Sequence, residues 1–211
     1  VWIHELCTEV PVAENQSRNA PDDYGINKAA IEDYLAECTD DGWFAGTVVH
    51  PGHIVGPGHL PINPAGNKNL GVFSKLMRGE ELALPNFGRE TLHHVHAADV
   101  AQVFIKSIQN REKSAGHGFH AVSPAAVTLA GFAQEAASWF GEEAKLRFLP
   151  WGEWENLNSK EDAALTLTHL LHSPSASIDK PRQLLGYEPK YTSLEAVRES
   201  VDWLLEDGQL R

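Results

Sequence analysis

The sequence has few cysteines, a deficit of basic residues and no long apolar run, and each shortage excludes a class of protein. Two cysteines, Cys7 and Cys38, are too few for a disulfide framework, so we expect a reducing, cytoplasmic setting. Because no apolar run approaches the length of a membrane-spanning helix, we expect no bilayer insertion. The net charge of −12 argues against nucleic acid or an anionic membrane surface as the main partner.

The remaining composition is that of a folded globular chain. Hydrophobic residues make up 42% and charged residues 22% of the 211 positions, a length that suits one domain or one domain with an added lobe. Apolar segments alternate with helical patterns, which predicts an α/β fold with a largely parallel sheet. Strands are expected at residues 1–4 ("VWIH"), within 44–52 ("FAGTVVHPG"), and at 92–96, 117–122 and 145–149.

Helices should connect these strands. One is expected to be capped by Asp22 or Asp23 and to run to about residue 39, with Ile31 and Leu35 on one apolar stripe. The other helices are expected at residues 69–78, 98–110, 129–140, 179–185 and 193–205. Pro11, Asn15, Ser17 and Asn19 predict a loop at residues 6–21, and Gly-rich and Pro-rich composition predicts another at 53–67.

The first of these helices carries a pair of residues with chemical potential. The stretch "DDYGINKAAIEDYL" (residues 22–35) places Tyr24 and Lys28 one turn apart on the same face. An ammonium group beside a phenol stabilises the phenolate, which makes a tyrosine a better base at neutral pH. Such a pair suits hydride transfer coupled to proton transfer, although the spacing alone also arises by chance.

The order of later motifs strengthens this interpretation. "YGINKAAIE" (24–32) is followed by "TVVHPGHIVGPG" (47–58) and "HHVHAADVAQVF" (93–104), and "IDKPRQLLGYEPKYTSLEAVRESVDWL" (178–204) comes near the end. Together they resemble the extended short-chain dehydrogenase/reductases, the NAD-dependent epimerase/dehydratase family, over nearly the whole chain. The resemblance implies the C-terminal part of a Rossmann-type doubly wound parallel sheet plus a small α/β substrate lobe. Residues 1–60 and 92–123 would form the Rossmann-type part, and 61–91 and 124–211 the substrate-binding lobe.

The resemblance also implies roles for single residues. Tyr24 would be the catalytic acid/base, and Lys28 would hold the cofactor ribose. The cofactor, NAD or NADP, would contact both of these residues and also Pro51, Gly52, His53 and Ile54. The expected activity is oxidation, reduction or epimerisation at a hydroxyl or carbonyl group of a sugar-like or other small substrate, by hydride transfer.

One motif of the family is missing. Family members begin with a strand and a G-x-x-G-x-x-G loop that receives the dinucleotide pyrophosphate, and "GHIVGPG" (52–58) has the wrong spacing. Aligned on the first strand and on Glu14, the family's catalytic Ser or Thr falls at or just before Val1. We therefore expect the C-terminal portion of a longer enzyme, inactive by itself. The alternative is a divergent relative without a cofactor.

Substrate recognition shows a second departure. Sugar-nucleotide members carry an Arg before the Asp-Val-Ala helix, where it binds the diphosphate, but Leu92 stands at this position. Arg89 is close in sequence, although a strand would direct its side chain to the opposite face. Asn69 and Leu70 match the family's Asn-Leu pair in the substrate lobe. The expected substrate contacts are His53, Asn69, Leu70 and Arg89, and a nucleoside diphosphate sugar stays open as the substrate.

The histidines do not predict a metal site. "HHVH" puts His94 and His96 on one face of a strand and His93 on the other, whereas zinc needs three or four converging ligands. The aromatic run at 148–157 is expected to hold the substrate lobe to the core, and "SKEDAA" (159–164) to be a solvated helix face.

Two further hypotheses concern function and assembly. A non-catalytic ligand-sensing or interaction module of the same fold is the alternative to an enzyme, because the glycine-rich loop is missing. The resemblance also implies a homodimer, because family members commonly pair through the helix that carries the Tyr–Lys pair. In this chain that helix offers small and aromatic residues that could pack on a second copy: Ala29, Ala30, Tyr34 and Ala36.

Overall fold

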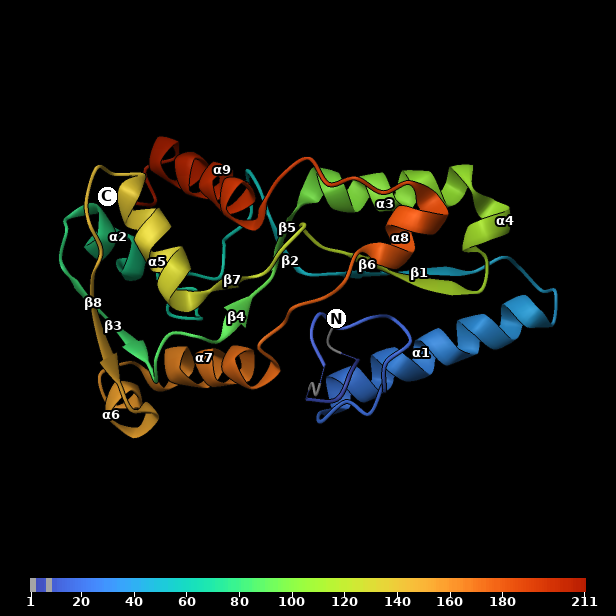
Figure 1. The fold of residues 1–211 in the computed structure, drawn as a ribbon, viewed down its shortest axis with the longest axis horizontal. Helices are drawn as coiled ribbons and strands as arrows, with labels where there is room; N and C mark the ends of the chain where they lie inside the picture. Colours follow the sequence, from blue (N-terminus) through green and yellow to red (C-terminus); the bar gives the residue numbers. More distant parts are fainter. Residues whose placement is uncertain (1–2, 7–8) are drawn as a thin grey trace.

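The computed structural model describes residues 3–6 and 9–211, which form two groups of elements joined through a pair of short central strands (Figure 1). In one group, β1 (Thr47–Pro51) and β6 (His117–Ala121) pair in parallel. Helix α1 (Asp23–Asp40) lies on one side of this pair and α3 (Ala97–Gln109) on the other, with α4 (Arg111–Ser114) and α8 (Asp179–Leu185) beside α3.

The second group contains the other helices and two further strand pairs. Its strands are β3 (Glu81–Pro85) with β8 (Lys145–Leu149), parallel, and β4 (Thr91–Leu92) with β7 (Val127–Thr128), antiparallel. Its helices are α2 (Gly71–Met77), α5 (Leu129–Ser138), α6 (Trp151–Glu155), α7 (Lys160–His172) and α9 (Ser193–Glu206). The central pair is β2 (His53–Val55) with β5 (His94–His96), also parallel. Three of the four described strand pairs are thus parallel, and the predicted α/β class is confirmed.

Several sequence-based expectations need correction. Ile3 and His4 lie in a turn and a bend, so the described half of "VWIH" is not a strand, while Val1, Trp2, Cys7 and Thr8 lie outside the described residues. The segment 53–67 is not entirely a loop, because β2 forms at its start. The strand expected at 92–96 is divided at His93 into β4 and β5, which pair with different partners.

Helix α1 forms as predicted but does not bury the predicted stripe. Asp22 caps it, since its Oδ1 accepts a hydrogen bond from the backbone N–H of Gly25 at 2.7 Å. Ile31 is 51% exposed and Leu35 only half-buried, whereas the buried positions are Gly25, Ala29 and Cys38. No described strand pairs with the second edge of β1, so this side of the molecule offers α1 little apolar surface to pack against.

Each of the two groups of elements has its own hydrophobic cluster. The larger lies among α2, α5, α9 and β3, and includes Phe73, Phe132 and Trp154. The smaller lies between β6 and the helices α3 and α8, and includes Phe119 and Tyr187. The two clusters are separate, and residues within 176–187 pack in the smaller one. The domain boundaries stay a prediction.

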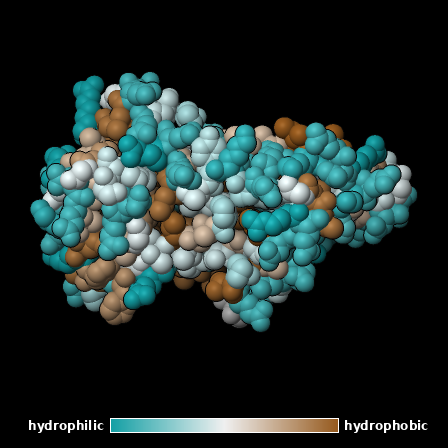
Figure 2. Space-filling view, turned by 45° about the horizontal axis from the view of Figure 1, so that its top comes forward, coloured by the Kyte–Doolittle hydropathy of each residue, from teal (hydrophilic) through white to brown (hydrophobic). Residues whose placement is uncertain are grey.

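The surface is mainly hydrophilic, with apolar residues in separate patches (Figure 2). None of the helices in the described ranges 3–6 and 9–211 is long and apolar enough to cross a membrane.

A buried carboxylate connects α3 to the C-terminal segment. Asp99, in the first turn of α3, is 1% exposed. Its two oxygens accept hydrogen bonds from the backbone N–H groups of Lys190, at 2.9 Å, and Tyr191, at 3.1 Å. The Asp of the Asp-Val-Ala motif therefore fixes the path of the chain between α8 and α9.

We predict that Asp99→Ala lowers the free energy of unfolding by about 2–4 kcal/mol, because two backbone N–H groups lose their acceptor in partly buried hydrogen bonds. Urea unfolding monitored by circular dichroism measures the change. Asp41→Ala, at an exposed position after α1, is the matched control and should change the midpoint little. Equal midpoints for the two variants would contradict the role of Asp99.

Candidate active site

Tyr24 and Lys28 lie together on the first two turns of α1, exposed to solvent. The Lys28 Nζ atom is 5.4 Å from the centroid of the Tyr24 ring, and Tyr24 is 61% exposed. The shared helical face predicted from the spacing is therefore present. A phenol and an ammonium group at this separation can act on one ligand.

Tyr24 stands between two clefts. The first, here called the His53 cleft, has a volume of 680 Å³ and is lined by Asp22, Tyr24, His53, Ile54, Leu60, Ile62, Lys68, Leu165, Thr168 and His169. The second, the His50 cleft, has a volume of 450 Å³ and is lined by Ile3, Tyr24, Lys28, Ile31, Glu32, Val48, Val49, His50, Pro51 and Gly52. Among the residues that the structure describes, Tyr24 alone appears in both linings.

The predicted cofactor contacts divide between these clefts. Lys28, Pro51 and Gly52 face the His50 cleft, whereas His53 and Ile54 face the His53 cleft. The sequence-predicted site residues at α1 and at 51–54 are thus brought together around Tyr24.

The expected substrate contacts are more scattered. Asn69 lines a third cleft of 600 Å³, where its Nδ2 donates to Asp162 Oδ2 at 3.0 Å. Leu70 is half-buried against the larger hydrophobic cluster, and Arg89 is exposed between β3 and β4. Leu92 is fully buried in the same cluster. Among these positions, only His53 lies beside Tyr24.

Gly52 sets the separation of the two clefts. Its N–H donates to the carbonyl of Ala121 at 3.1 Å, and the next N–H, of His53, donates to the carbonyl of His93 at 2.9 Å. A Cβ on Gly52 would collide with the His93 carbonyl oxygen, so no other residue fits without movement of the backbone. The chain can therefore change its partner strand within one residue, because β1 before Gly52 pairs with β6 and β2 after it pairs with β5.

Helix α7 forms a wall of the His53 cleft that the sequence did not predict. Leu165, Thr168 and His169 line the cleft, and the helix is fastened to the loop at 61–70 by polar contacts. Thr166 Oγ1 donates to the carbonyl of Ala65 at 2.9 Å, and His169 Nδ1 donates to that of Gly66 at 2.7 Å. The sequence does contain one local pattern that marks the start of this helix, Ser159-x-x-Asp162. Ser159 caps the helix, since its hydroxyl oxygen accepts a hydrogen bond from the Asp162 N–H at 3.0 Å.

The histidines in and near the His53 cleft have lowered pKa values. Burial lowers the pKa of His94 to about 3 and that of His93 to about 4. His93 has the hydrogen bonds of a neutral ring, because Nε2 donates to the Ser123 carbonyl at 2.9 Å and Nδ1 accepts from the Ala176 N–H at 3.1 Å. Burial also lowers the pKa of His53 well below its usual value. Within the described residues, no group of His, Cys, Asp and Glu side chains could hold a metal ion.

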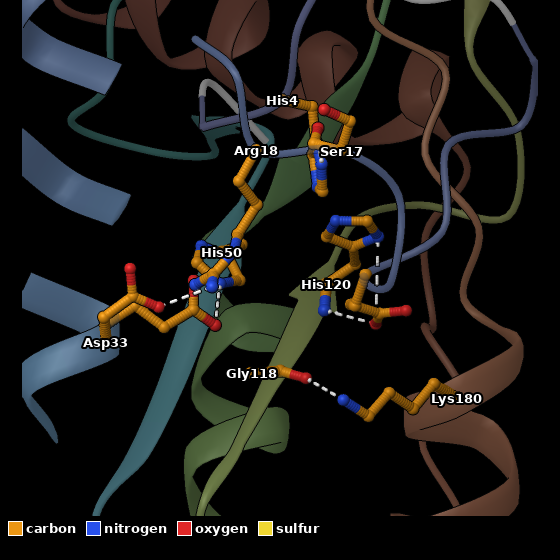
Figure 3. A network of polar contacts seen from close by, with 10 residues as sticks. His4, Ser17, Arg18, Asp33, His50, Gly118, His120 and Lys180 are labelled. Atoms are coloured by element: carbon orange, nitrogen blue, oxygen red, sulfur yellow. Dashed lines mark hydrogen bonds and ion pairs between the residues drawn. The ribbon is translucent and has the colours of Figure 1, made fainter. Parts of the chain in front are cut away.

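A second polar network borders the His50 cleft (Figure 3). The Nε2 of His50 lies 3.1 Å from Glu32 Oε1, and Arg18 contacts the same carboxylate at 3.4 Å. Burial raises the pKa of Glu32, but the hydrogen bond from His50 and the charge of Arg18 outweigh it and bring the pKa below its usual value. Gly118 leaves room for the pair, since a Cβ there would collide with both side chains.

The same network continues across the sheet to His120. The backbone N–H of His120 donates to Glu14 Oε1 at 2.8 Å, and the ring Nδ1 of His120 donates to the Ser177 carbonyl at 3.1 Å. Burial lowers the pKa of His120 to about 2, so its approach to Glu14 is not an ion pair at neutral pH. The network joins the N-terminal loop, α1, β1 and β6 (Figure 3).

Parallel strands flanked by helices, with a Tyr–Lys pair between two clefts, define an α/β protein with a Rossmann-like fold. A comparison with models of known protein families identifies the family of this chain. The chain belongs to the NAD dependent epimerase/dehydratase family, whose model matches residues 7–121. A search of curated proteins found no match to the sequence.

Solved structures show the same fold. The chain is similar to the UDP-glucose 4-epimerase of Thermotoga maritima with UDP-glucose (TM-score 0.71, 20% identity, 98% of this chain and 61% of that one). It is also similar to the dTDP-glucose 4,6-dehydratase of Bacillus anthracis in complex with NAD (TM-score 0.70, 14% identity, 99% and 60%). A third is RMD from Pseudomonas aeruginosa complexed with NADPH (TM-score 0.69, 14% identity, 96% and 63%). The chain thus spans about three fifths of the length of these structures.

The buried neutral histidines predict loss of stability in mild acid. Unfolded imidazoles take up protons as the pH falls through about 6.5, whereas folded His93 and His94 stay neutral down to about pH 4 and 3. The free energy of unfolding should therefore fall between about pH 7 and 5, by about 1 kcal/mol for each such ring at pH 5.5. Urea unfolding across this range measures the slope. Ring signals of His93 and His94 that titrate near pH 6.5 by NMR would contradict the prediction.

Proposed function

We propose that this chain supplies the acid/base part of an NAD(P)-dependent oxidoreductase or epimerase that acts on a hydroxyl or carbonyl group of a sugar-like or other small substrate. The observation that carries the proposal is the position of Tyr24, which lies between two clefts with Lys28 beside it. One cleft would hold the substrate and the other the nicotinamide end of the cofactor.

The residues around the His50 cleft suit that end of a dinucleotide. Lys28 offers ammonium donors for the ribose hydroxyl groups, and the backbone at Pro51 and Gly52 forms the opposite part of the cleft. When bound, the nicotinamide supplies the hydride transfer. The pyrophosphate needs donors that these residues do not supply, and the sequence contains no G-x-x-G-x-x-G loop.

Tyr24 would then move the proton that accompanies the hydride. In an oxidation its phenolate oxygen accepts the proton of the substrate hydroxyl group, and in the reverse direction the phenol returns a proton to the carbonyl oxygen. Lys28 lies beside the Tyr24 ring, with its Nζ atom 5.4 Å from the ring centroid, so it would bind the ribose next to the site of proton transfer. His53 lines the cleft next to Tyr24 and would orient the substrate.

Asn69, Leu70 and Arg89 line neither of the two clefts beside Tyr24. Asn69 would contact a substrate long enough to reach the third cleft, next to Asp162. Leu70 and Arg89 line none of the three clefts described above, so their contacts with substrate stay predictions.

Replacement of Tyr24 tests the function. In the protein that carries this chain, Tyr24→Phe should lower kcat on the order of a hundredfold or more, because the acid/base group is removed. Tyr34→Phe is the matched control, since it lies on the same helix, is 59% exposed and lines neither cleft. Unchanged turnover in Tyr24→Phe would refute the acid/base role. Binding of no NAD(H) or NADP(H) by the wild type, measured by calorimetry, would favour a non-catalytic ligand-sensing module.

We also propose a homodimer formed through α1. Ile26, Ala30 and Tyr34 follow at spacings of four on one exposed face of this helix, and Ile26 is 51% exposed. A self-complementary contact of small and aromatic residues is a common way to build a twofold dimer.

Light scattering at micromolar concentration tests the assembly. The wild type should be a dimer, and Ile26→Asp should shift it to a monomer because a charge would be buried at the contact. Ile105→Asp on α3, with Ile105 54% exposed, is the matched control and should leave the dimer intact. A monomeric wild type would contradict the prediction.

A further inference from the structure

We propose that the His53 cleft binds an uncharged, partly apolar hydroxy or carbonyl compound in preference to a phosphorylated one. This inference rests on the proposed function, because it names the substrate class of the cleft beside Tyr24. It follows from the charges that line the cleft and from the contacts those groups already make.

The cleft lining contains one cation and one carboxylate, which balance each other. Asp22 holds its charge in place, because its Oδ1 accepts the Gly25 N–H at 2.7 Å as the cap of α1. Lys68 is exposed, so water and salt screen its attraction for an anion. A phosphate in the cleft would therefore meet no net positive charge.

The two imidazoles of the cleft add hydrogen-bonding groups without charge. Burial lowers the pKa of His53 well below its usual value, and burial also lowers the pKa of His169. The donation from His169 Nδ1 to the Gly66 carbonyl fixes the orientation of that ring. Neutral imidazoles bind hydroxyl and carbonyl groups, but they do not compensate the charge of a phosphate.

Aliphatic side chains make up the rest of the wall. Ile54 comes from β2, Leu60 and Ile62 from the loop after it, and Leu165 from α7. Such a wall favours an apolar ring by about 25 cal/mol for each Å² removed from water. It opposes an unpaired anion, because aliphatic side chains form no hydrogen bonds that would replace the lost hydration.

A matched pair of probes tests the inference on the 211-residue chain: 2-naphthol and 2-naphthyl phosphate. They share one ring system, and the ester adds a charge of about −1.5 to −2 at pH 7. Ligand-observed NMR gives both dissociation constants, and broadening of the His169 and Thr168 signals shows that binding is in the cleft. We expect 2-naphthol to bind at least about tenfold more tightly than the phosphate.

A charge placed in the cleft should change this preference. Thr168 lines the cleft, and its hydroxyl group donates to the Ala164 carbonyl within α7 at 3.0 Å. Thr168→Arg should tighten binding of 2-naphthyl phosphate by about three- to fivefold, the gain of one partly exposed ion pair. Leu167→Arg, at the next position and outside the cleft lining, is the control and should not.

Phosphate ester binding as tight as that of 2-naphthol, or no binding of 2-naphthol, would overturn the inference. An equal gain from Thr168→Arg and Leu167→Arg would do the same, because it would place the anion outside the cleft. None of these results depends on turnover, so the acid/base role of Tyr24 is judged separately from the kcat of Tyr24→Phe.

Discussion

The backbone contact at Gly52 is the constraint on which the candidate site depends. Before it, β1 pairs with β6, and after it, β2 pairs with β5. The change of partner takes place within one residue, because the absence of a Cβ lets the chain pass against the His93 carbonyl. Pro51 and Gly52 therefore face one cleft while His53 and Ile54 face the other. Tyr24 reaches both clefts only because they meet at this point.

The interior around this point is stabilised by histidines used as neutral polar groups. Each ring donates one hydrogen bond to a backbone carbonyl: His94 to Ile62, His93 to Ser123 and His120 to Ser177. The arrangement joins segments that are distant in sequence without burying a charge, which would be far more costly. Neutral imidazoles also occur at His53 and His169 in the His53 cleft, so the packing of the interior also sets the chemistry of the cleft.

Local patterns in the sequence predicted much of this fold. The cap at Asp22, the strand at 47–51 and the helices before and after Gly186 depend on neighbouring residues and were predicted correctly. The division of 92–96 at His93 was not, because it depends on which partner strand lies alongside each half. Only the first residues of α7, within 159–164, were expected to be helical. The rest of the helix was missed because it is held by polar contacts such as that of Thr166 with Ala65, which leave no strong apolar stripe in the sequence.

The candidate site divides in the same way between local and long-range features. Tyr24 and Lys28 share a helical face, so their spacing was enough to place them together. The cleft lining of Lys68, Thr168 and His169 comes from segments about one hundred residues apart, and no spacing rule brings them together. Tyr24 is 61% exposed, whereas proton transfer in step with hydride transfer requires a dry site. Because Tyr24 forms the border of both clefts, ligands that fill them would remove it from water. The same border residue that joins the clefts would then become a buried acid/base only when both are occupied.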